Sequence, residues 1–199
     1  ESNVESKNPL YIQELASVLN IVHISDCFFL KQSKKELQNI TLKICNFFLS
    51  KNTKIIVAAC NTATCYALSY LRSKIKIPII GTVPAIKPAT EKSKKGIIGI
   101  ISTPATSKSP YLKNLIDSYA KNIKTINIGC FGLENAVETG NLNSPETNFL
   151  LNKYLTPIKK SRADIVVLGC THYPFLKPQI KKIFGRNVKL IDSGKSIAK

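Results

Sequence analysis

Two strand-length apolar segments that end in cysteine constrain the fold most strongly. The segments are Lys54-Ile-Ile-Val-Ala-Ala-Cys60 and Asp164-Ile-Val-Val-Leu-Gly-Cys170, and small polar residues follow each cysteine. Uninterrupted apolar runs of this length are typical of strands that are buried on both faces of a parallel sheet, and a helix is expected after each. The repetition of one unit, with its cysteines at positions 60 and 170, indicates two related α/β halves.

Hydrophobic periodicity along the rest of the chain predicts alternating helices and strands. Ser33 and Glu36 have the spacing of a capping box at the start of the clearest amphipathic helix. A doubly wound α/β fold with parallel sheets and helices on both faces follows from this order. The Pro- and Lys-rich stretch near residue 88 is the expected hinge between two pseudo-symmetric lobes. Helices are expected at 10–19, 34–49, 61–73, 110–120, 148–160 and 178–184, and strands at 21–24, 54–59, 77–81, 96–101, 125–128, 164–169 and 189–191.

Composition excludes several classes of protein. The formal charge of the 199-residue chain is +17, but only three of its 29 basic residues are arginine, the residue that dominates DNA reading. A dedicated nucleic-acid binder is therefore not expected. No apolar run approaches the roughly 20 residues that a membrane span needs. The polar start of the chain shows no signal peptide, and the six cysteines show no C-x-x-C pair, so we expect reduced thiols in a cytoplasmic protein.

The two strand-end cysteines are the candidates for chemistry. Ligands of open α/β sheets bind outside the carboxyl ends of the strands, where Cys60 and Cys170 are expected. Backbone N–H groups and helix dipoles at such positions are expected to lower the pKa of a thiol, and Thr62, Thr64 and Thr171 add hydroxyls. One thiol on each side of a cleft, about 6 to 9 Å apart, would suit removal of a proton from one face of a carbon and its return to the other.

The residues around both cysteines resemble a known family. Cys60-Asn-Thr-Ala-Thr64 and Gly169-Cys-Thr-His-Tyr-Pro174 are similar to the two signature motifs of the glutamate racemase family, in the aspartate/glutamate racemase superfamily. The resemblance covers most of the chain and implies a two-lobed α/β fold, with residues 1–88 and 192–199 in one lobe and 89–191 in the other. Further matching segments are 78–81, 98–106, 137–140 and 191–194.

The resemblance also implies a reaction and roles for particular residues. The reaction would be the interconversion of L- and D-glutamate, which would supply D-glutamate for peptidoglycan. Independently of the resemblance, the sequence shows no motif for a metal or cofactor, so none is expected, and it leaves open whether the protein is a homodimer. Cys60 and Cys170 would be the two acid/base thiols, with Asp26 supporting the first and Glu138 and His172 supporting the second. The residues that would bind substrate are Asn61, Thr62, Thr106, Thr171 and Ser2.

Three segments depart from the family pattern. Glu1–Ser6 lacks the glycines of the D-S-G-type motif, 27–33 lacks the P-Y-G loop, and the chain stops at Lys199, whereas the family continues. The expected fold does not depend on these segments, but the expected activity does. Two alternatives therefore stay open: an aspartate- or hydantoin-type racemase on the same fold, and an inactive racemase-like protein that acts as a basic binding module.

Overall fold

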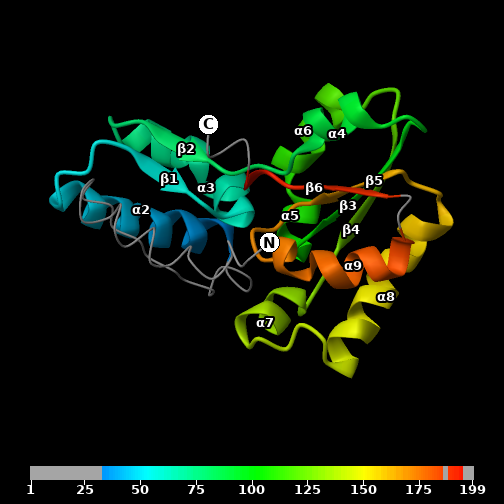
Figure 1. Cartoon of the computed structure of the whole chain (residues 1–199). Helices are drawn as coiled ribbons and strands as arrows, with labels where there is room; N and C mark the ends of the chain where they lie inside the picture. The colour runs from blue at the N-terminus through cyan, green and yellow to red at the C-terminus, as the bar shows by residue number, and fades with distance from the viewer. Residues whose placement is uncertain (1–32, 186–187, 195–199) are drawn as a thin grey trace, which may run out of the picture.

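The computed structural model describes residues 33–185 and 188–194 (Figure 1). The helix predicted at 10–19 and the strand predicted at 21–24 lie outside the described residues, as do Ser2 and Asp26. Within the described part, all strands belong to two parallel sheets that helices flank. This arrangement confirms the predicted α/β class.

The smaller sheet pairs β1 (Ile56–Ala58) with β2 (Ile79–Gly81), and α3 (Asn61–Lys74) connects the two strands. α2 (Lys34–Ser50) packs on α3, and its predicted capping box is present, with both bonds between Ser33 and Glu36 formed. The core of this part lies between the sheet and these two helices. Its buried members are Cys45, Ile56, Ala67, Leu68, Leu71, Ile75 and Ile79.

The prediction that the strand at 54–59 is buried on both faces is wrong, and its neighbour at 77–81 is exposed on the same face. Ile56 and Ile79 face the helices, but Val57 and Ile80 are 46% and 44% exposed. Among the described residues, α2 and α3 cover one face of β1 and β2, whereas the apolar run in the sequence suggested two covered faces. An apolar run fits either arrangement, because strand composition does not record how many layers pack on a sheet.

The larger sheet has the strand order β4-β3-β5-β6, and all three neighbouring pairs are parallel. The central strand β5 is buried along its whole length, which confirms the prediction for that segment. The strands are β3 (Ile97–Ser102), β4 (Lys124–Gly129), β5 (Ile165–Leu168) and β6 (Lys189–Ile191).

Helices cover both faces of this sheet (Figure 1). On one face, α4 (Ile86–Lys92) and α6 (Pro110–Tyr119) pack on Ile98 and Ile100 of β3. On the other face, α7 (Leu133–Glu138), α8 (Pro145–Lys160) and α9 (Lys177–Phe184) pack around Ile101. Alternate residues of β3 therefore enter two separate cores, as the twofold periodicity of a strand requires. Two short elements, α5 (Pro104–Lys108) and η2 (Tyr173–Leu176), follow the carboxyl ends of β3 and β5.

The Pro-rich stretch near residue 88 forms α4, a helix that the sequence did not predict. Ala85, Ile86 and Ala89 are buried in the core of the larger sheet. The packing unit of the larger sheet thus begins before residue 88, while the division into two lobes at that residue stays a prediction. Within residues 33–185 and 188–194, no helix has the length and hydropathy that crossing a membrane requires.

Candidate active site

Cys60 lies two residues beyond β1 and is the N-cap of α3. Its extended backbone turns the chain from the strand into the helix, and its Sγ accepts the N–H of Ala63 at 3.5 Å. The thiol therefore faces the free N–H groups of the first helical turn. This placement at the carboxyl end of a parallel strand is the one that the sequence predicted.

Cys170 occupies the matching place after β5, separated from the strand by Gly169. The residue is buried, with 7% of its surface exposed. Its Sγ lies 3.7 Å from Nδ1 of His172, and Nε2 of the same ring pairs with the carboxylate of Glu138 at the end of α7. The structure thus brings together Cys170, His172 and Glu138, the three residues that the resemblance grouped around the second thiol.

Three threonine hydroxyls join the ends of α3 and α5. Thr62 Oγ1 lies 2.9 Å from Thr103 Oγ1 and 3.0 Å from Thr106 Oγ1, and the last two are 3.1 Å apart. All three residues are buried. Thr103 is the member of this group that the sequence analysis did not assign to the site. The sequence does carry a signal for this residue: a threonine directly before a proline is a typical N-cap, with the proline at the first position of the helix.

Asn61 and Thr171 are the remaining predicted ligand-binding residues within the described part of the chain. Asn61 is buried, and among the described residues neither its Oδ1 nor its Nδ2 has a hydrogen-bond partner. Thr171 is half-buried beside Cys170. A buried amide without partners carries a donor and an acceptor that a ligand can use, because leaving them unpaired is costly.

The expectation that both thiols have lowered pKa values is wrong. Burial raises the pKa of Cys60, although hydrogen bonds from Ala63 and Thr62 lower it in part. Burial also raises the pKa of Cys170 to about 12, although hydrogen bonds from the backbone N–H groups of His172 and Tyr173 lower it in part. The helix-end donors are present as predicted, but desolvation of the thiolate outweighs them. The charge of Cys60 raises the pKa of Cys170 as well, so the two thiols lie within electrostatic reach of each other.

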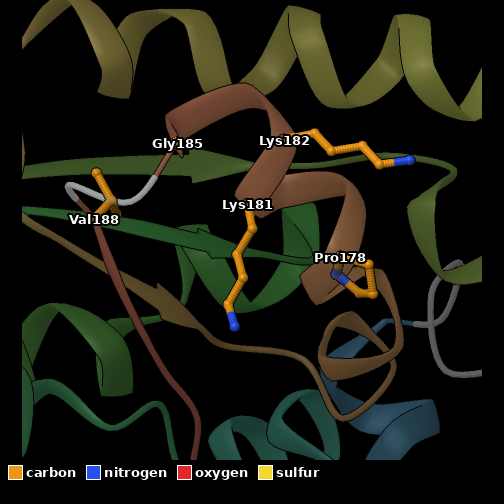
Figure 2. Close-up of a pocket in the computed structure, with 5 residues that line it drawn as sticks. All are labelled: Pro178, Lys181, Lys182, Gly185 and Val188. Carbon is orange, nitrogen blue, oxygen red and sulfur yellow. The ribbon is translucent and has the colours of Figure 1, made fainter.

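Two cavities on the surface of the larger sheet lie away from both thiols. One, of about 490 Å³, is lined by Pro178, Lys181, Lys182, Gly185 and Val188 (Figure 2). An adjoining groove of about 600 Å³ lies near the amino ends of β5 and β6. The groove is rich in lysine. Its lining residues are Lys92, Lys94, Asp164, Ile165, Lys177, Lys181, Val188, Lys189 and Leu190.

Comparison with known proteins identifies the family. The model of the family described as Asp/Glu/Hydantoin racemase matches residues 12–199. The chain belongs to this family. The glutamate racemase of Roseiflexus sp. (strain RS-1) is 37% identical over 183 residues, which cover 90% of this chain and 67% of the relative. The glutamate racemase of Pseudomonas syringae pv. tomato is 36% identical over 184 residues, with the same coverage of both chains.

Solved structures of glutamate racemases share the fold. The Escherichia coli enzyme, crystallised with L-glutamate and the activator UDP-MurNAc-Ala, superposes with a TM-score of 0.80 and 28% identity. The match covers 94% of this chain and 74% of that one. The Francisella tularensis enzyme, crystallised with D-glutamate, has a TM-score of 0.72 and 26% identity, over 91% of this chain and 70% of that one.

Proposed function

We propose that this chain is a cofactor-independent racemase that interconverts L- and D-glutamate by proton transfer between two thiols. The observation that carries the proposal is the matched placement of Cys60 and Cys170, each at the carboxyl end of a parallel strand and within electrostatic reach of the other. Proton removal on one face and return on the other needs two such acid/base groups. The similarity to glutamate racemases supports glutamate over aspartate or hydantoin as the substrate.

In one direction, the Cys60 thiolate removes the α-proton and the bonding electron pair stays on the α-carbon. Hydrogen-bond donors such as the Asn61 amide stabilise the charge that spreads onto the adjacent carboxylate. The Cys170 thiol then gives its proton to the opposite face of the carbon, which leaves Cys60 protonated and Cys170 ionised. The opposite enantiomer uses the same groups in reversed roles.

The raised pKa values require a reason why a thiolate forms at all. The ammonium group of a bound amino acid favours an ionised thiol nearby, because opposite charges at short range stabilise each other. For Cys170, His172 supplies a second route: its Nδ1 can take the thiol proton, and Glu138 stabilises the imidazolium that results. The residue that the resemblance assigns to the same task at Cys60 is Asp26, which lies outside the described residues.

Exchange of the α-proton in heavy water tests the proposal. The wild-type protein should racemise both enantiomers of glutamate and incorporate deuterium at the α-carbon. Cys60→Ser and Cys170→Ser should each lose racemisation by at least about 100-fold, the typical contribution of one acid/base group. The thiol that remains in each variant should still exchange the α-proton of one enantiomer without inverting it.

Cys65→Ser is the matched control, because Cys65 lies one turn into α3 and burial raises its pKa to about 11. This variant should keep wild-type activity. Racemisation that survives Cys60→Ser or Cys170→Ser would contradict the mechanism, and a folded wild-type protein without exchange would contradict the activity. Turnover of aspartate or a hydantoin, but not of glutamate, would instead support an aspartate- or hydantoin-type racemase.

The product would supply D-glutamate for peptidoglycan, in a cytoplasm that keeps the cysteines reduced. A cell-wall role predicts that supplied D-glutamate rescues growth of cells that lack the protein.

A further inference from the structure

Buried polar atoms without partners gather at one edge of the smaller sheet. Among the described residues, five buried side-chain atoms have no hydrogen-bond partner, and three of them belong to Asn61 and Thr82. These residues are 3% and 1% exposed, so bulk solvent does not take the place of a partner. Native proteins leave few buried polar groups unpaired, and each such group calls for an explanation. Asn61 adjoins Cys60 and already belongs to the proposed site, but no role has been assigned to Thr82.

The backbone places Thr82 beside the strand end that carries Cys60. Thr82 follows Gly81, the last residue of β2, and its N–H donates to the carbonyl of Ala58 at 3.1 Å. Ala58 is the last residue of β1, two positions before Cys60. Thr82 therefore extends the ladder between β1 and β2 at the carboxyl edge, where parallel sheets bind their ligands.

The same connection reaches the second thiol. Pro84 is so close to the residue before Cys170 that a Cβ built on Gly169 would lie 3.4 Å from Pro84 Cγ. Residues 82–84 thus run from the strand end of Cys60 to the strand end of Cys170. The hydroxyl-bearing residue Thr82 therefore lies on the segment that connects the surroundings of the two candidate acid/base groups.

We propose that Thr82 is a further substrate-binding residue, whose hydroxyl donates a hydrogen bond to a carboxylate oxygen of the amino acid. A hydroxyl is both donor and acceptor, and a carboxylate is the strongest acceptor that the proposed substrate offers. Together with Nδ2 of Asn61, it would give the carboxylate two neutral donors at the edge of the smaller sheet. This inference rests on the proposed function.

Thr82→Val tests the inference, because valine fills the same volume without the hydroxyl. The KM for D-glutamate should rise about 10- to 100-fold, the usual effect of losing one hydrogen bond to a charged group. Calorimetric binding of D-glutamate should weaken by the same factor. The thermal midpoint of the free protein should stay equal or rise, since the hydroxyl that is removed has no partner within the protein. Thr82→Ser keeps the hydroxyl and should restore KM to within a few-fold of wild type.

Thr90→Val is the matched control: it makes the same change in α4, where the hydroxyl donates to the carbonyl of Lys87 at 2.8 Å. Its KM should equal that of wild type. An unchanged KM in Thr82→Val, or a lowered thermal midpoint that Thr82→Ser restores together with KM, would overturn the role of Thr82 and show a structural one. After either of these outcomes, the proposed function still holds if the wild-type protein is active. A wild-type protein that neither binds nor racemises glutamate would overturn the proposed function together with the role of Thr82.

Discussion

At the scale of single residues, the role proposed for Cys170 in proton transfer depends on the groups around its buried thiol. Burial raises its pKa to about 12, so at neutral pH the thiol is protonated and needs a nearby base before it can accept a proton from substrate. His172 lies 3.7 Å away, and its other ring nitrogen pairs with Glu138. A carboxylate on the far side of an imidazole fixes the tautomer and stabilises the protonated ring. We therefore expect Glu138 to be a positioning residue that acts on the thiol through His172.

Glu138→Gln should lower kcat about 10- to 100-fold at pH 7, with a smaller effect on KM. The amide keeps a hydrogen bond to the ring but loses the negative charge, so less of the imidazolium–thiolate pair forms. The deficit should shrink as the pH rises from 7 to 9. The wild-type thiolate forms mainly by proton transfer from Cys170 to His172, whereas the variant depends more on ionisation of the thiol to solvent, and that ionised fraction increases tenfold with each unit of rising pH up to the thiol pKa. Initial rates of racemisation across this pH range measure the effect.

A thermodynamic constraint sharpens this test. L- and D-glutamate have equal free energies in solution, so any variant must lose kcat/KM by the same factor in both directions. Glu91→Gln makes the same substitution at an exposed position of α4 and should leave the pH profile unchanged. A Glu138→Gln variant with wild-type rates, or with a deficit that stays constant from pH 7 to 9, would contradict the positioning role.

At the scale of helices and strands, local chemistry made some elements predictable. α2 was predicted almost to its ends because an apolar stripe and a capping box both lie within its own sequence. β5 was predicted as fully buried, and helices do cover both faces of its sheet. β1 and β2 have equally apolar sequences, but Val57 and Ile80 are exposed. Among the described residues, helices pack on one face of the smaller sheet and on both faces of the larger sheet, a difference that the sequence of a strand does not encode.

α4 was missed because proline was interpreted as a sign of a hinge. Pro88 is the third residue of this helix. In the first turn the backbone N–H groups have no carbonyl partner within the helix, so a proline there removes no hydrogen bond. Ile86 and Ala89, both buried against the larger sheet, give this short helix its stability through packing.

Gly99 of β3 allows α8 to pack closely on the sheet, which leads to a prediction about stability. A Cβ at position 99 would lie 2.4 Å from Cγ2 of Ile158, so Gly99→Ala forces the helix or the side chain to move. We expect a loss of about 1–3 kcal/mol in the free energy of unfolding, the usual cost of overpacking a core. Urea unfolding followed by circular dichroism measures it.

A double-mutant cycle identifies the cause. Ile158→Ala alone should cost about 2–5 kcal/mol, because it leaves a cavity under α8. The double variant Gly99→Ala/Ile158→Ala should lose less free energy of unfolding than the two single variants lose together, because the new methyl group then occupies the space left by Ile158. Additive losses would show that the clash with Ile158 is not the source of the instability.

At the scale of the whole molecule, burial explains which features of the site could be predicted from sequence. The positions of Cys60 and Cys170 depend on local strand–turn patterns and were predicted directly. The pairing of His172 with Glu138 joins residues 34 positions apart, and only the resemblance to a family suggested it. The sign of the pKa shifts was predicted wrongly, because desolvation depends on how every element packs around a thiol.

The surplus of positive charge is also a property of the whole chain, and part of it gathers in the groove beside β6. Five lysines line this groove together with Asp164, whose carboxylate already accepts bonds from the Ser93 hydroxyl and the backbone N–H groups of Lys94 and Lys95. Lys177 pairs with Asp192. Among the described residues, no ion pair holds the other lysines of the groove, which are Lys92, Lys94, Lys181 and Lys189.

This charge distribution predicts weak DNA binding that depends on salt but not on base sequence. Lysine neutralises phosphates without reading bases, and the chain has only three arginines for that purpose. Fluorescence anisotropy with two unrelated labelled 20-bp duplexes should give equal affinities at 20 mM salt and little binding by about 150 mM. The triple variant Lys92→Gln/Lys94→Gln/Lys189→Gln should reduce the slope of log K against log salt by about 2 to 3.

A second triple variant separates the groove from net charge. Lys121→Gln/Lys153→Gln/Lys160→Gln removes the same charge from exposed positions outside the groove. If the groove is where phosphates bind, this variant should change the slope by less than 1. Equal slopes for the two triple variants would show that binding follows net charge alone. A preference for one duplex that persists at 150 mM salt would instead favour a dedicated nucleic-acid binder over a racemase whose basic surface attracts anions without selecting among them.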